Sequence, residues 1–334
     1  MNARPWLAVG LIAAAASTAS AQATPSSQCP GGSLPTDPNR VSQDACQQAR
    51  DLFQFMAPQV GLALTGGNTI LGGGGTLGGP GHFRISIRGN AVAGAVPKVQ
   101  DLQPRSSGAT PARTFQTTAA FIPLPTVDAA LGVFKGIPLG LTNVGGVDLL
   151  ASATYVPDVS ASNVELTVSG SKLKIGYGAR VGLLQESILV PGVSASWLRR
   201  ETPMLNLVAS AGSSTLSVRD LAVQTDALRL VASKSFLVFG LAAGVGQDRY
   251  SSESTISGRY VAGVTQANSA PAPVAQDMSR TNYFVDLSLN LPFIKIVGEV
   301  GQATGGTVTT FNQFEGAQAS GARTYFSAGI TIGF

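Results

Sequence analysis

The sequence is poor in charged residues. Asp, Glu, Lys and Arg together make up 12% of the 334 residues, about half the fraction that is usual in soluble domains. A well-solvated surface normally carries more charge than this. The formal net charge is only +4, and the basic residues are scattered, which excludes the concentrated basic patch that nucleic-acid binding requires. We therefore expect no nucleic-acid partner.

Histidine and metal-ligating clusters are also scarce. His82 is the only histidine, and no arrangement of Ser and Asp accompanies it, although nucleophilic catalysis needs a base beside the nucleophile. The two cysteines, Cys29 and Cys46, do not have the spacing of a zinc site. The sequence therefore predicts a protein that is not an enzyme and that binds neither a metal nor a cofactor.

After the first 21 residues the sequence has no apolar run as long as the roughly 20 residues that a membrane-spanning helix needs. At the N-terminus, Arg4 precedes an apolar run from Trp6 to Ala16, and small residues lead to Ala21 and Gln22. This order is typical of a cleavable secretory signal. We predict a signal peptide over residues 1–21, with cleavage between Ala21 and Gln22.

The predicted export affects the expected state of the two cysteines. An even number of cysteines in an oxidising compartment suggests a disulfide, so we predict that Cys29 and Cys46 are joined. Two unpaired thiols are the alternative. The loop between them is short, and its closure would contribute about 3 kcal/mol at most.

Residues 22–81 are predicted to form an N-terminal segment that is periplasmic or plug-like. Asp37 and Pro38 suit the N-cap and first position of a helix, and Pro58 is expected to end it. Apolar residues recur between them at helical spacing: Val41, Ala45, Ala49, Leu52 and Met56. We predict one short helix at about 38–57, which either plugs the barrel described below or caps it on the periplasmic side.

A glycine-rich stretch occupies residues 61–81. Gly73, Gly75 and Gly78 have the spacing G-x-G-x-x-G, but a strand pattern follows them where a dinucleotide site would need a helix. Glycine permits close backbone packing and sharp bends. We therefore interpret this stretch as a segment folded into a barrel rather than as a cofactor site.

From His82 onward, apolar and polar residues alternate. Phe83, Ile85 and Ile87 lie on one face of the predicted strand, and Arg84 and Arg88 lie on the other. The same period of two recurs at 147–155, 175–183, 237–245 and 283–291, and it predicts antiparallel strands. A soluble barrel would turn the apolar face inward, whereas a membrane barrel turns it toward lipid.

Loop lengths favour the membrane barrel. Tight turns are predicted at 122–125, 187–191, 233–235 and 290–293, and long loops at 94–112, 251–280 and 303–321. Short periplasmic turns and long external loops are typical of outer-membrane barrels. We predict an all-β, transmembrane antiparallel up-and-down barrel over residues 82–334, with about 12 strands and a range of 10–14. The first ring strands are placed near 82–93, 114–122, 126–135, 145–156 and 163–170. The strand pattern is weak at 163–170 and 204–233, which is why the range extends from 10 to 14.

The C-terminal alternation continues to the last residue. Its apolar face consists of Phe326, Ala328, Ile330, Ile332 and Phe334. This pattern resembles the closing strand of bacterial outer-membrane β-barrels. The resemblance implies that Phe334 belongs to the signal read by the barrel-assembly machinery. It also implies a location in the outer membrane of a bacterial cell, with outer-membrane lipid as a partner.

The order of signal peptide, short N-terminal segment, glycine-rich stretch and barrel also resembles that of the FadL-type transporters of hydrophobic compounds. In that family an N-terminal hatch fills the barrel and ligands leave sideways into the membrane. Residues 64–75 lie where the hatch would be. The Asn-Pro-Ala motif of the hatch is missing and the predicted barrel is smaller, so no ligand-binding residue is carried over from the family.

Charges on the inward faces are the candidate functional residues. They are Arg84, Arg88, Arg180, Asp286, Lys295 and Glu299. Such charges either set ion selectivity or pair with one another to hold the interior together. We favour pairing because opposite charges occur on adjacent strands. Trp197, Arg199 and Arg200 are interpreted instead as anchors at the membrane interface.

The sequence as a whole favours a passive channel or transporter for small solutes, hydrophobic ones among them. The alternative is a barrel that transports nothing, whose long loops serve adhesion or envelope integrity.

Overall fold

The computed structural model describes residues 24–31, 39–98, 100, 102–161, 163–262 and 265–333. The predicted signal peptide, its cleavage residues Ala21 and Gln22, and the terminal Phe334 lie outside these residues.

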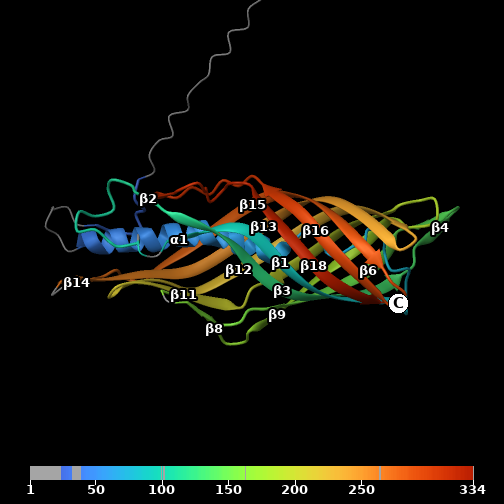
Figure 1. The fold of residues 1–334 in the computed structure, drawn as a ribbon, viewed down its shortest axis with the longest axis horizontal. Helices are drawn as coiled ribbons and strands as arrows, with labels where there is room; N and C mark the ends of the chain where they lie inside the picture. Colours follow the sequence, from blue (N-terminus) through green and yellow to red (C-terminus); the bar gives the residue numbers. More distant parts are fainter. Residues whose placement is uncertain are drawn as a thin grey trace, which may run out of the picture.

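Ten of the fourteen strands of the main sheet form a closed antiparallel ring (Figure 1). The ring closes because the last strand pairs with the first, from Arg84 opposite Gly333 to Val92 opposite Tyr325. In chain order the ring strands are β1 (Phe83–Pro97), β3 (Thr117–Phe134), β6 (Gly146–Tyr155), β9 (Leu173–Leu184), β10 (Gly192–Glu201), β12 (Ser214–Phe236), β13 (Phe239–Ala262), β15 (Ala272–Asn290), β16 (Ile294–Thr304) and β18 (Arg323–Gly333). The architecture is the predicted up-and-down barrel, with the smallest strand number of the predicted range.

Two corrections account for the lower number. The turn predicted at 122–125 was wrong, because β3 runs without interruption through Pro123 and Pro125. Proline is tolerated in a strand where no neighbour needs its N–H, and the part of β3 before Thr126 has no partner on the side of β6. In addition, β8 (Val164–Ser169) is not a ring strand, since it pairs with β11 (Met204–Ala211) and β7 (Val159–Ala161).

The two ends of the barrel differ. At one end β13 and β15 extend as a paired hairpin as far as Ile256 opposite Ala272, so the loop predicted at 251–280 is mostly strand. This long-hairpin end also carries β11, β8 and β14 (Thr265–Asn268) (Figure 1). The other, short-turn end holds residue 333, the turns at 185–191 and 291–293, and the hairpin of β4 (Ile137–Leu139) and β5 (Thr142–Val144). Two short strands, β2 (Thr114–Phe115) and β17 (Gln313–Phe314), pair in parallel.

The ring is apolar outside and polar inside. On β1, Ile87 is 66% exposed whereas Ser86 and Arg88 are almost completely buried. On β15, Leu287 is 62% exposed and Asp286 is fully buried. A soluble barrel would have the opposite arrangement, because its apolar face would avoid water. No helix in the described part of the chain has the length and hydropathy to cross a membrane.

Helix α1 (Asn39–Thr65) lies along the inside of the barrel and contacts mainly β13 and β12 (Figure 1). It enters from the long-hairpin end, and its last residues lie deep in the lumen. The expectation that Pro58 ends the helix was wrong, since the helix continues for seven more residues. An internal proline costs about 3 kcal/mol, but the apolar contacts of the buried residues around it, such as Ala57 and Leu62, outweigh that cost.

The predicted disulfide between Cys29 and Cys46 is confirmed, with 5.5 Å between the two Cα atoms. It ties residues 24–31 to the first turns of α1. Nearby, the Ser42 hydroxyl donates a hydrogen bond to the carbonyl of Asn268 beside β14, at 3.2 Å. The start of α1 therefore lies at the long-hairpin end, opposite the end where β1 begins and β18 finishes. Between the two, the chain passes once through the lumen.

Candidate functional site

The C-terminal end of α1 points into a group of buried arginines. Arg200 donates a hydrogen bond to the carbonyl of Thr65 at 2.8 Å, and Arg229 donates to the carbonyls of Gly66 at 3.0 Å and Gly67 at 2.7 Å. The last carbonyls of a helix have no partner within the helix, and this end of the helix dipole attracts cations. The arginines therefore cap the helix inside the barrel.

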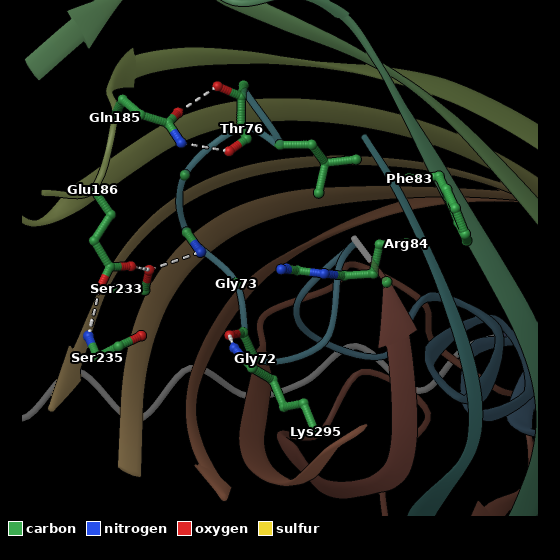
Figure 2. A pocket seen from close by; sticks show the side chains of 14 residues that line it. Gly72, Gly73, Thr76, Phe83, Arg84, Gln185, Glu186, Ser233, Ser235 and Lys295 are labelled. Atoms are coloured by element: carbon green, nitrogen blue, oxygen red, sulfur yellow. Dashed lines mark hydrogen bonds between the residues drawn. The ribbon is translucent and has the colours of Figure 1, made fainter. Parts of the chain in front are cut away.

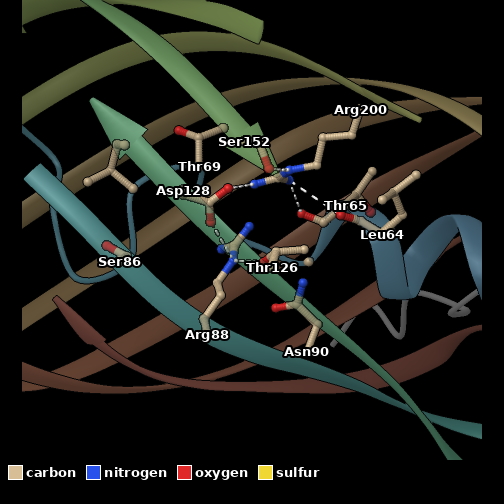
Figure 3. Close-up of polar contacts among 12 residues, drawn as sticks. Leu64, Thr65, Thr69, Ser86, Arg88, Asn90, Thr126, Asp128, Ser152 and Arg200 are labelled. Carbon is tan, nitrogen blue, oxygen red and sulfur yellow. Dashed lines mark hydrogen bonds and ion pairs between the residues drawn. The ribbon is translucent and has the colours of Figure 1, made fainter. Parts of the chain in front are cut away.

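Carboxylates on the ring strands neutralise these arginines. Asp128 lies between Arg88, at 2.8 Å, and Arg200, at 2.9 Å (Figure 3). Arg229 pairs in the same way with Asp248. All five side chains are buried, and a buried charge is tolerated only when it is paired and hydrogen-bonded.

Another buried ion pair lies at the level of β6 and β9. Arg180 contacts Asp148 at 2.7 Å, and the same carboxylate accepts a hydrogen bond from the amide of Leu77 at 3.2 Å. Of the predicted lumen charges, Arg88 and Arg180 are thus joined to carboxylates that the sequence analysis did not single out. Their inward position on alternating strands was the only signal that could have identified them.

Two acidic residues hold the chain just after α1. Glu299 accepts hydrogen bonds from the amides of Gly67 at 3.1 Å and Asn68 at 2.7 Å. Asp286 accepts hydrogen bonds from the Asn68 side chain at 2.7 Å and from the amide of Gly72 at 2.9 Å. Residues 66–72 are therefore clamped between arginines on one side and carboxylates on the other. We call residues 66–77 the plug.

The rest of the plug follows the wall toward the short-turn end (Figure 2). The amide of Gly74 donates to Ser233 at 2.9 Å, and the Thr76 hydroxyl donates to Gln185 at 2.7 Å. Lys295 donates to the carbonyl of Gly72 at 2.9 Å. Arg84 projects beside Gly73. The six predicted charges thus all face the lumen, but they belong to four separate groups and not to one constriction: Arg88, Arg180, Asp286 with Glu299, and Arg84 with Lys295.

The interpretation of Arg200 as an interfacial anchor was wrong, because its side chain is 1% exposed inside the barrel. Trp197 and Arg199 do lie on the outer face of β10, where both contact Asp226 on β12. The alternation along β10 separates them, since residues 197 and 199 share one face and residue 200 lies on the other.

An apolar cavity of about 510 Å³ lies between α1 and the wall, on the long-hairpin side of the arginines. Helix residues Leu52, Met56 and Val60 line one side. The other side is lined by residues of β1, β3, β6, β7, β8, β11 and β12. Among the described residues that line it, none is charged, and the only side-chain hydroxyls are those of Tyr155 and Thr202. Sequence analysis did not find this cavity, because its walls come from distant parts of the chain.

The cavity lies at a seam in the barrel wall, which we define as β3 residues 121–125 facing residues 155–161 and 163–166. Strands β3 and β6 pair only from Thr126 opposite Thr154 toward the short-turn end. Beyond that point β3 has a partner on the β1 side alone. Phe121 and Tyr155 at the seam are both exposed. The wall beside the cavity is therefore not closed by strand pairing.

This inside-out closed ring identifies the fold. The chain is a β-barrel protein of the outer-membrane type. No protein-family model and no curated protein sequence matches it.

Among solved structures it resembles the Escherichia coli outer-membrane protease OmpT, with 10% identity over 76% of this chain and 97% of the protease and a TM-score of 0.39. The Pseudomonas putida toluene transporter TodX has 10% identity over 85% of this chain and 97% of that chain, with a TM-score of 0.28. An anion-selective porin from Comamonas acidovorans has 11% identity over 76% and 98%, with a TM-score of 0.18. Likenesses this weak carry no activity or ligand over to this chain.

Proposed function

We propose that the barrel lies in the outer membrane of a bacterium and conducts small apolar solutes from its long-hairpin end, through the apolar cavity, to the lipid at the seam. The observation that carries this proposal is the cavity itself. Burial of apolar surface contributes roughly 25 cal/mol per Å², and the cavity offers a solute that surface with almost no polar group to desolvate.

The plug supports a sideways exit. Between the cavity and the short-turn end lie the buried ion pairs Arg88–Asp128 and Arg229–Asp248 and the backbone of the plug. An apolar solute would have to displace paired charges to pass them, which is far more costly than moving sideways into lipid. Pro123 and Pro125 lie at the seam and offer no N–H to a neighbouring strand.

The lining also argues for transport over catalysis. General acid–base chemistry needs a titratable side chain within reach of the substrate, and the part of the cavity wall that the structure describes contains no Asp, Glu, His or Lys. The carboxylates nearest to it, such as Asp128, are held by arginines. We therefore assign the barrel no enzymatic reaction.

The test is uptake of a small aromatic hydrocarbon by vesicles that contain the folded protein. Leu207→Trp and Val164→Trp each place extra volume in the cavity from a half-buried position, and we expect each to reduce uptake about tenfold. Val168→Trp is the matched control, because it lies on β8 beside the cavity but does not line it. Its uptake should equal that of the wild type.

Single-channel recording completes the test. The plugged lumen should give negligible ion conductance in the wild type. If the wild-type barrel folds but does not accelerate hydrocarbon uptake, the transport proposal is wrong, and the barrel is a structural or adhesive one.

A further inference from the structure

A second, polar pocket of about 250 Å³ opens at the short-turn end of the lumen (Figure 2). The plug separates it from the apolar cavity. Its walls include the glycine run 72–75, the start of β1 and β16, and residues of the turn after β9. Two cationic side chains, Arg84 and Lys295, face one carboxylate, Glu186, across it.

Arg84 differs from the other inward arginines of the ring. Arg88 and Arg180 each have a carboxylate within 3 Å, whereas Arg84 is half-buried and makes no hydrogen bond or ion pair with any residue the structure describes. A guanidinium carries five N–H donors in a planar fork. The described residues supply no acceptor for these donors, so the guanidinium can bind an acceptor that enters the pocket.

With two cations, Arg84 and Lys295, against one carboxylate, Glu186, the pocket carries a net positive charge. Lys295 uses one donor on the carbonyl of Gly72, and an ammonium has three donors. Glu186 accepts hydrogen bonds from the Ser233 hydroxyl at 3.3 Å and from the amide of Ser235 at 2.6 Å. Within the described chain, Glu186 comes within 4 Å of neither cation.

The glycines shape the pocket around the cations. A Cβ on Gly73 would lie 2.7 Å from Nη1 of Arg84, and a Cβ on Gly72 would lie 3.2 Å from the Lys295 side chain. Gly333, opposite Arg84 on β18, also carries no side chain into this space, where a Cβ would lie 3.1 Å from the Arg84 Cα. Larger residues at these positions would displace the guanidinium or fill the pocket.

We propose that this pocket binds a small oxyanion, the carboxylate or phosphate group of a solute or lipid on the short-turn side of the membrane. The planar guanidinium of Arg84 would bind it through two parallel hydrogen bonds, a geometry that suits both carboxylate and phosphate. Lys295 would supply the second positive charge. The site is independent of the apolar cavity and does not require that the barrel transport anything.

The test is calorimetric titration of the full chain in a maltoside detergent with inorganic phosphate and with succinate, at constant ionic strength set by chloride. The wild type should bind at least one of them saturably. Arg84→Gln and Lys295→Gln should each weaken binding by about tenfold or more, which corresponds to about 1.4 kcal/mol, because each removes a charged hydrogen bond to the anion. Arg249→Gln, an exposed arginine on β13, is the matched control and should bind like the wild type.

Heat-modified gel mobility would show whether each variant is folded, and Lys295→Gln keeps the test valid if Arg84→Gln does not fold. Absence of saturable binding for both anions, or equal binding by the wild type and both variants, would overturn the proposal. Binding that persists in lipid nanodiscs identifies a free anion as the ligand, whereas loss of binding in nanodiscs identifies a lipid phosphate that already occupies the pocket. Leu207→Trp should retain anion binding even if it abolishes hydrocarbon uptake.

Discussion

The two halves of the lumen are filled by opposite chemistry. Toward the short-turn end, charged side chains meet the backbone of the plug, and almost every group has a specific partner. Toward the long-hairpin end, one side of α1 faces apolar side chains and leaves a cavity, while Asp44 and Asp51 on its other sides bind polar loop residues. Directional bonds fix the position of one segment, whereas apolar contact is non-directional and tolerates empty space. Under the proposed function, this difference would allow one barrel to exclude ions and still hold an apolar solute.

The largest loss of stability should follow from neutralising Asp128, at the centre of the charged half of the lumen. Asp128→Asn leaves Arg88 and Arg200 without their carboxylate in a buried site. Removal of one partner from a buried ion pair costs about 3–5 kcal/mol, and measurable ion conductance should appear as the plug loosens. Urea unfolding followed by gel mobility, together with single-channel recording, would measure both. Asp158→Asn removes an exposed pair with Lys172 and should change neither.

A smaller effect should follow from releasing the plug on its other side. Glu299→Ala removes the acceptor for the amides of Gly67 and Asn68. Unpaired buried donors cost about 1–3 kcal/mol, so these two amides should exchange with deuterium faster while the ring strands stay protected. Glu253→Ala, at an exposed position of β13, is the control. Unchanged exchange at residues 67 and 68 would show that the carboxylate does not hold the plug.

At the long-hairpin end, Asp51 should make the stability of the protein depend on pH. Burial raises the pKa of Asp51 to about 6 from an ordinary value of 3.8, although the amides of Phe311 and Asn312 and the side chains of Asn312 and Gln47 partly offset this. Because folding raises the pKa of this carboxyl, protonated Asp51 contributes its full stabilisation below about pH 4. That stabilisation is lost as the pH rises through 6. The loss should be of the order of 1–3 kcal/mol.

Asp51→Asn cannot ionise, so its stability should not fall across this range. Unfolding in urea at pH 4.5 and 7.5 would compare the variant with the wild type. If both lose the same stability between these two pH values, Asp51 does not titrate in this window.

The smallest effect on the stability of the barrel should come from removal of the disulfide. Cys46→Ser removes the covalent link between residues 24–31 and α1, while the hydrogen bond from the Ser26 amide to Gln47 remains. We expect Cys29 to become reactive to a thiol reagent, while barrel unfolding stays unchanged. A large fall in barrel stability would mean that these residues support the lumen, and the contrast between the two halves would need revision.

Several elements could be predicted because their signal is local. Strict alternation along β15 and β18 placed Leu287 outside and Asp286 inside, as the structure has them. Local sequence signals gave wrong predictions where contact with a distant segment determines the secondary structure. Pro123 and Pro125 have the composition of a turn, yet they continue β3 because the neighbouring strand ends early there. Pro58 has the composition of a helix end, yet the helix continues within the lumen.

The candidate site was less predictable than the fold. Inward charges could be named from their register, but their partners could not. Asp128 meets Arg200 from 72 residues away, and Glu299 meets Asn68 from 231 residues away. The apolar cavity gave no signal at all, because each of its lining residues looks like an ordinary core or membrane-facing residue when taken in its own strand.

By itself the sequence determined which side chains share a face, since successive residues of a strand point to opposite sides whatever surrounds them. Only the tertiary structure decided that Arg88 and Arg180 pair with carboxylates, whereas Arg84 has no carboxylate partner among the residues that the structure describes. Closure of the ring and entry of α1 set those distances, and the energy of a buried charge depends on the groups within a few ångströms of it, not on its neighbours in the chain.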